Sequence, residues 1–211
     1  MDTTKKITVI SVIQEGIGIG IKNIVSLICA TLLWIITIWI PFINVGTTIA
    51  MCSIPIELSK GHVISPLFIF DGKYRQYMGE FFNLIGLMLL SLLPAFLFMV
   101  IPAYIIAIGW SLAVYIMLDK GISPSEALIQ SNKATYGYKW TIFFVSLILM
   151  VAFFIVSFIF SKLGTVGSIL NFILIVVFYP IVLGCNTVIY RNLAKNNDVA
   201  EVTVEIEETV L

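Results

Sequence analysis

The residue types that carry chemistry in enzymes are few and scattered in this chain of 211 residues. Its single histidine, His62, follows Glu57 by five residues, so the two side chains could form an acid–base pair. One histidine cannot build a His-rich metal site. We expect the pair to be a solvated polar cap, and we predict no catalytic, cofactor-binding or metal-binding residue.

The cysteines and the glycines near the N-terminus do not form a reactive motif either. Cys29, Cys52 and Cys185 stand singly in apolar runs without C-x-x-C spacing, which predicts small buried hydrophobic side chains. The glycine-rich segment 16–20 lacks the lysine and hydroxyl residue of a phosphate-binding loop. Glycines four residues apart there favour close helix packing, with a flexible entry segment as the alternative.

The composition places the chain in a membrane. Apolar residues make up 60 % of the chain and charged residues only 11 %. In a soluble domain about half of the residues are apolar and about a quarter are charged. The mean hydropathy is +1.07. The formal net charge is zero, so no basic excess indicates binding to nucleic acid. The lipid bilayer is therefore the solvent expected for most of this chain.

Long apolar stretches interrupted by prolines predict how the chain crosses the bilayer. A span needs about 20 residues, which fits stretches 140–160 and 168–190 but not the much longer 23–58 and 81–118. Proline removes a helical hydrogen bond, and the expected helix breakers are Pro41, Pro102 and Pro180. We therefore predict an all-α integral membrane protein with six transmembrane helices arranged as three hairpins.

The positions of the basic residues test this arrangement. Three of the twelve Lys and Arg residues precede the first hairpin, six lie between hairpins and two follow the last. Only Lys162 falls at the opposite side. Because basic loops are retained in the cytoplasm, both termini are predicted to be cytoplasmic.

A short motif recurs after each of the first two hairpins. A Lys-Gly pair is followed within a few residues by Ser-Pro, at Lys60-Gly61 and Ser65-Pro66 and again in segment 120–124. Serine before proline is typical of a helix start, and in the second copy Glu126 predicts a capping box. We expect amphipathic interfacial helices at 10–22, 66–77 and 124–136, one before each hairpin. The unit would then be an internal threefold repeat.

The second copy of the motif resembles a known group of bacterial polytopic proteins. The residues that carry the resemblance are Asp119, Gly121, Ser123, Pro124, Glu126, Ala127, Ser131 and Gly137. The aromatic segment 68–73 is also similar. The group includes the membrane domain attached to some glycerophosphodiester phosphodiesterases and related families of uncharacterised function. The resemblance implies a six-helix membrane module in a bacterial cytoplasmic (inner) membrane. It transfers no activity, because the phosphodiesterase chemistry belongs to a separate soluble domain.

These patterns lead to one favoured function and one alternative. We expect a single membrane domain over residues 1–195 and an acidic, mobile cytoplasmic tail over 196–211, or else a tail that pairs with a partner as a strand. The favoured function is a non-catalytic accessory factor that organises the membrane or binds lipid or another membrane protein, with homo-oligomers allowed. The alternative is a small transporter, channel or lipid flippase-like protein. An intramembrane enzyme is the least favoured class.

Overall fold

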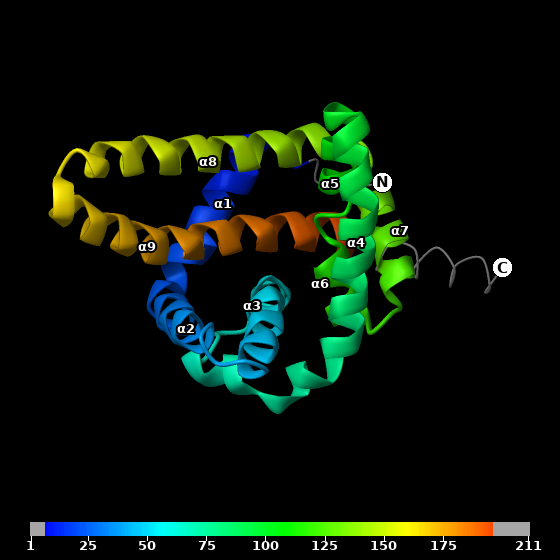
Figure 1. Ribbon diagram of the computed structural model, residues 1–211, viewed down its shortest axis with the longest axis horizontal. Helices are drawn as coiled ribbons and strands as arrows, with labels where there is room; N and C mark the ends of the chain where they lie inside the picture. The colour runs from blue at the N-terminus through cyan, green and yellow to red at the C-terminus, as the bar shows by residue number, and fades with distance from the viewer. Residues whose placement is uncertain (1–6, 196–211) are drawn as a thin grey trace.

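The computed structural model describes residues 7–195, which fold into helices without any strand (Figure 1). The acidic tail 196–211 lies outside the described residues. The first half contains α1 (Val9–Lys22), α2 (Ile24–Thr37), α3 (Ile43–Ser59), the 3-10 helices η1 (Pro66–Phe70) and η2 (Gly72–Tyr77), and α4 (Met78–Phe98). The second half contains α5 (Val100–Gly109), α6 (Ala113–Lys120), α7 (Pro124–Ala134), α8 (Lys139–Ser161), α9 (Gly164–Tyr190) and the π-helix η3 (Arg191–Lys195).

Four helical segments are long and apolar enough to cross a membrane. They are Gly72–Phe98, Val100–Lys120, Lys139–Ser161 and Gly164–Lys195. The helices α1 and α2 would add a fifth if they acted as one span, but they are bent by 79°. The predicted all-helical class is therefore confirmed, with four or five candidate spans, whereas the count of six and the three hairpins are not confirmed. Helix α3 has 17 residues, and most of its side chains are buried inside the protein.

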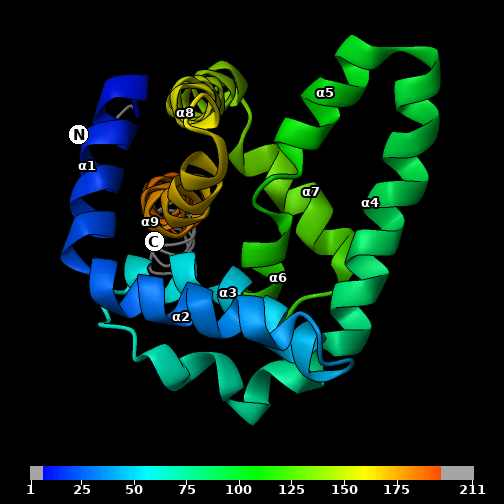
Figure 2. The same cartoon turned by 60° about the vertical axis from the view of Figure 1, so that its left-hand side comes forward.

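The helix pairs point in different directions. Helices α8 and α9 lie side by side along the width of Figure 1 and are seen almost end-on in Figure 2. Helix α4 stands upright in both views, α5 runs obliquely beside it in Figure 2, and α2 runs across the lower part of Figure 2. The structure thus has two long arms, α4–α5 and α8–α9, that leave a base in which α1, α2, α3, α6 and α7 are gathered.

The prolines act differently from one another. Pro41 lies in the turn between α2 and α3, as predicted, next to Phe42 with a φ of 67°. The second turn is at the extended residue Met99, and Pro102 lies inside α5 at its third residue. The N–H of that position has no intrahelical acceptor, so a proline costs little there. Pro180 lies within α9 and does not end it.

Glycines let α1 and α9 approach until their backbones touch. A methyl group at Gly16 would lie 2.7 Å from the backbone nitrogen of Cys185, and one at Gly20 would lie 2.7 Å from the carbonyl oxygen of Pro180. A methyl group at Gly184 would collide with the carbonyl of Gly16. The prediction of close packing at these glycines is confirmed. The cysteines are free; Cys185 is buried, and Cys29 and Cys52 are partly buried.

Two of the three expected amphipathic segments are α-helices. The segments 10–22 and 124–136 correspond to α1 and α7, whereas 66–77 consists of two 3-10 helices. The break comes at Asp71, which is extended and accepts a hydrogen bond from the N–H of Lys73 at 3.0 Å. This side chain caps a new helix start, so one continuous helix cannot form across it.

Candidate functional site

The ends of three helices that are far apart in the sequence meet at one polar cluster. Lys60 follows α3, Asp119 lies in the last turn of α6, and Tyr190 ends α9. The ammonium of Lys60 is 2.7 Å from the Asp119 carboxylate, which also accepts a hydrogen bond from the Tyr190 hydroxyl. We call these three residues, with Glu57 and His62, the polar junction. It links the segments that the sequence predicted as three separate hairpins.

The charges of the polar junction stabilise one another. Burial alone would lower the pKa of Lys60, but its hydrogen bond and attraction to Asp119, helped by Glu57 at 3.6 Å, raise it above the ordinary value. The Glu57 carboxylate also lies 2.8 Å from Nδ1 of His62. The structure therefore brings the predicted pair together. The imidazole is 64 % exposed, which fits the expected solvated cap.

Left-handed glycines end the helices that carry the repeated motif. Gly61 follows α3 with a φ of 79°, and Gly121 ends α6 with a φ of 64°. This conformation favours glycine because a Cβ would be strained there. Each glycine precedes a Ser-Pro helix start, but the first copy leads into a 3-10 helix without a side-chain cap and the second into a capped α-helix.

The start of α7 is built by the motif residues in sequence order. Ser123 caps it by accepting a hydrogen bond from the N–H of Glu126 at 3.4 Å, and Pro124 occupies the first helical position. The Glu126 carboxylate accepts from the amide of Gln130 at 3.2 Å. Only the serine half of the predicted capping box is therefore present. Gly137 has a φ of 81° where the chain turns from α7 into α8.

Helix α7 braces the break between α5 and α6. The buried Ser131 hydroxyl donates to the carbonyl of Gly109 at 2.7 Å and accepts from the N–H of Leu112 at 3.2 Å. Thr135 donates to the same Gly109 carbonyl at 3.2 Å, and Ala127 is fully buried. The motif singled out Ser131 and Ala127 but missed Thr135. Two small hydroxyl residues one helical turn apart are the signal that could have found it.

A cavity of about 140 Å³ opens beside the polar junction. Two carboxylates and two ammonium groups line it, from Glu57, Asp119, Lys60 and Lys73. Tyr74 lines it as well, and within residues 7–195 its buried hydroxyl meets no partner in hydrogen-bonding geometry. Known pockets for small molecules hold about 300 Å³ or more, so this one suits water or a small polar group. Lys73 and Tyr74 were not predicted as site residues.

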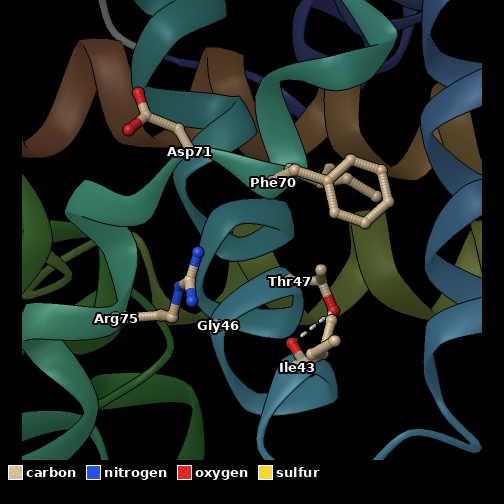
Figure 3. A pocket seen from close by; sticks show the side chains of 7 residues that line it. Ile43, Gly46, Thr47, Phe70, Asp71 and Arg75 are labelled. Atoms are coloured by element: carbon tan, nitrogen blue, oxygen red, sulfur yellow. Dashed lines mark hydrogen bonds between the residues drawn. The ribbon is translucent and has the colours of Figure 1, made fainter.

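A second cavity, of about 120 Å³, lies at the start of α3 (Figure 3). Asp71 and Arg75 reach it from the 3-10 segment, and the Arg75 side chain lies against Gly46. At its floor the Thr47 hydroxyl donates to the carbonyl of Ile43 at 3.2 Å. The segment after α3 thus returns along α3 to its other end.

The site offers charge and hydrogen bonding but no grouped metal ligands. Among residues 7–195 there is no group of three or more His, Cys, Asp or Glu side chains that could hold a metal ion. No family model, curated protein or solved structure matches the chain. The helices themselves define the class: an all-helical protein with several segments able to cross a membrane.

Proposed function

We propose that this protein is a non-catalytic accessory factor of the bacterial cytoplasmic membrane that organises the bilayer or binds lipid or another membrane protein. The observation that carries the proposal is the exposure of its two arms. In the 18-residue apolar stretch of Gly72–Phe98 only 6 % is buried within the protein, and in that of Lys139–Ser161 only 11 % is buried. Such surfaces need an apolar environment, which lipid tails or partner helices supply.

The polar groups support a structural role for the base. Lys60 and Asp119 neutralise each other, and Tyr190 adds a hydrogen bond to the same carboxylate. A group that is fully engaged in holding helices together is poorly placed to act on a substrate. The same junction supports the proposed threefold repeat, because equivalent helix ends meet there.

The proposed topology keeps both termini in the cytoplasm. The distribution of Lys and Arg supports it, since eleven of twelve lie at one side of the predicted hairpins. An even number of crossings, either the four segments described above or the six expected from the sequence, satisfies this rule. The six-crossing version requires α2 and α3 to cross as well.

The alternative, a small transporter, channel or lipid flippase-like protein, draws on the cavity at the polar junction. Its mixed charges suit a zwitterionic group, but about 140 Å³ is small for a transported solute. Purified protein in liposomes is expected to give no solute flux and no lipid scrambling above empty vesicles. Flux that Lys60→Gln abolishes would favour the alternative instead.

A photocrosslinking experiment in native membranes tests the favoured function. A photoreactive residue is placed at Leu93 on α4 or at Phe158 on α8, which are 60 % and 64 % exposed. We expect crosslinks to lipid or to a second membrane protein from both positions. The buried Leu84 on α4 is the matched control and should give none. Equal yields at all three positions would contradict the proposal.

A further inference from the structure

Helices α2 and α3 are short for a crossing. With 14 and 17 residues they extend about 21 and 26 Å, whereas the hydrocarbon core is about 30 Å thick. The bend of 79° between α1 and α2 also prevents those two from forming one straight span. Length alone does not show whether α2 and α3 cross the bilayer, because a bilayer can thin locally around short helices.

The chain that follows α3 provides the stronger argument. Lys60 stands at the end of α3, but Asp71 and Arg75 lie beside Ile43 and Gly46 at its start. These two levels are about 20 Å apart along the helix. The segment 60–71 therefore runs back along almost the whole length of α3.

This returning segment cannot follow α3 through lipid. It consists of residues 60–65 outside any helix and a short 3-10 helix, so many of its backbone groups lack regular partners. Irregular backbone is tolerated at membrane depth only when it is covered by protein or water. Asp71 and Arg75 are exposed and charged, and each would be costly inside the hydrocarbon core.

The outer side of α2 is suited to lie on a membrane. Val25, Leu32 and Ile36 follow helical spacing along one face of α2, and Trp39 follows two residues after the helix ends; all are exposed, Trp39 by 86 %. Phe42 extends this face into the turn and is 79 % exposed. The opposite face of α2, with the buried Leu27 and Ala30, packs in the core formed with α3. Tryptophan beside aliphatic side chains is typical of a helix at the lipid–water boundary.

We infer that the α2–α3 unit, residues 24–59, does not cross the bilayer but docks from the cytoplasmic side into a single leaflet. Its partner is the boundary between lipid headgroups and acyl chains, which receives the face from Val25 to Phe42. The four segments described above then remain as the candidate crossings. This inference rests on the proposed cytoplasmic position of segment 60–77, and the experiment separates the two.

Accessibility of single cysteines tests the inference in the full-length protein. Cys29, Cys52 and Cys185 are replaced by alanine, and one cysteine is placed at Asn44, Asp71 or Thr165. Sealed vesicles of both orientations are treated with a membrane-impermeant maleimide. We expect Asp71→Cys to react only from the cytoplasmic face, Thr165→Cys only from the outer face, and Asn44→Cys from neither.

Each other outcome has a distinct meaning. Reaction of Asn44→Cys from the outer face would show that α2 and α3 cross, which overturns the inference but leaves the proposed function intact. Rapid reaction from the cytoplasmic face would place the turn in water and also overturn it. Reaction of Asp71→Cys from outside would overturn the proposed topology itself.

A depth measurement identifies the leaflet as the partner. Trp39→Cys carries a small fluorophore, and the vesicles contain lipids with a quencher near the headgroup or at the end of the acyl chain. We expect stronger quenching by the shallow quencher. Absence of quenching by either lipid would indicate that protein, such as a second copy, covers this face and would overturn the inference.

Charges at the turn provide a complementary test. The double change Trp39→Asp and Phe42→Asp is expected to expel the turn and raise labelling of Asn44→Cys from the cytoplasmic face at least tenfold. The matched control is Ile129→Asp, an exposed apolar position on α7, which should leave this labelling unchanged. Equal labelling of Asn44→Cys alone, with the double change and with Ile129→Asp would overturn the inference.

Discussion

Helices α3 and α4 are both apolar, yet they are used in opposite ways. Eleven of the 17 residues of α3 are buried inside the protein, whereas in α4 only Leu84 is buried. The base around α3 is held by backbone contacts, ion pairs and buried hydroxyl groups, and the arms offer apolar surface to their surroundings. Hydrophobicity by itself therefore does not distinguish a helix that faces lipid from one that faces protein.

The largest difference is expected between Gly184, where the arm helix α9 packs against α1 of the base, and Gly86, on the open part of the arm helix α4. Gly184→Leu would drive a side chain into the carbonyl of Gly16, so we expect a loss of about 3 kcal/mol of unfolding free energy. Gly86→Leu on the arm helix α4 is the matched control, because a Cβ there meets nothing within 4 Å. Unfolding in mixed micelles, followed by circular dichroism, measures both. Similar losses at the two sites would break the distinction.

The buried brace of α7 should come next. Ser131→Ala leaves the N–H of Leu112 without its acceptor and removes one of the hydrogen bonds to the carbonyl of Gly109. We expect the free energy of unfolding to fall by about 1–3 kcal/mol. Ser125→Ala on the exposed side of α7 is the control and should stay within about 0.5 kcal/mol. The same unfolding assay applies. An unchanged stability of Ser131→Ala would mean that Thr135 alone secures the break.

The ion pair of the polar junction should have a smaller effect. Asp119→Asn removes the charged partner of Lys60, whose side chain is 34 % exposed, so solvent screening limits the loss to about 1 kcal/mol. A double-mutant cycle with Lys60→Gln isolates the coupling between the two residues. Coupling near zero would show that the junction is held by packing around Tyr190 instead.

The same pair gives stability a direction of pH dependence. The pKa of Lys60 is raised in the folded protein, so its contribution is complete below the ordinary value of 10.5 and is lost as pH rises through the folded pKa. We expect thermal stability to fall above pH 10.5 more steeply in the native protein than in Asp119→Asn. Parallel pH profiles would contradict this.

The smallest effect is expected at the edge of the junction. His62→Ala removes a side chain that is 64 % exposed although it lies 2.8 Å from Glu57, so the change should stay within about 0.5 kcal/mol. Thermal unfolding measures it. A loss above about 1 kcal/mol would mean that the imidazole is part of the base rather than a solvated cap.

The sequence by itself determined the helical class, the membrane environment and several local features, for physical reasons that act over a few residues. Apolar composition requires lipid, and Ser123-Pro124 starts α7 because an N-cap needs no distant partner. The turn at Pro41 and the close packing at Gly16 and Gly20 follow from equally local rules.

Only the tertiary structure decided which apolar helices are enclosed by protein and which residues meet. Lys60, Asp119 and Tyr190 come together because three helices end at one place, a relation that spacing along the chain cannot encode. Likewise, the stretch 23–58 has the apolarity of two spans, but segment 60–77 returns along α3 and brings the charged residues Asp71 and Arg75 beside the start of that helix. The cost of burying this chain in lipid depends on which elements are neighbours, so only the fold reveals it.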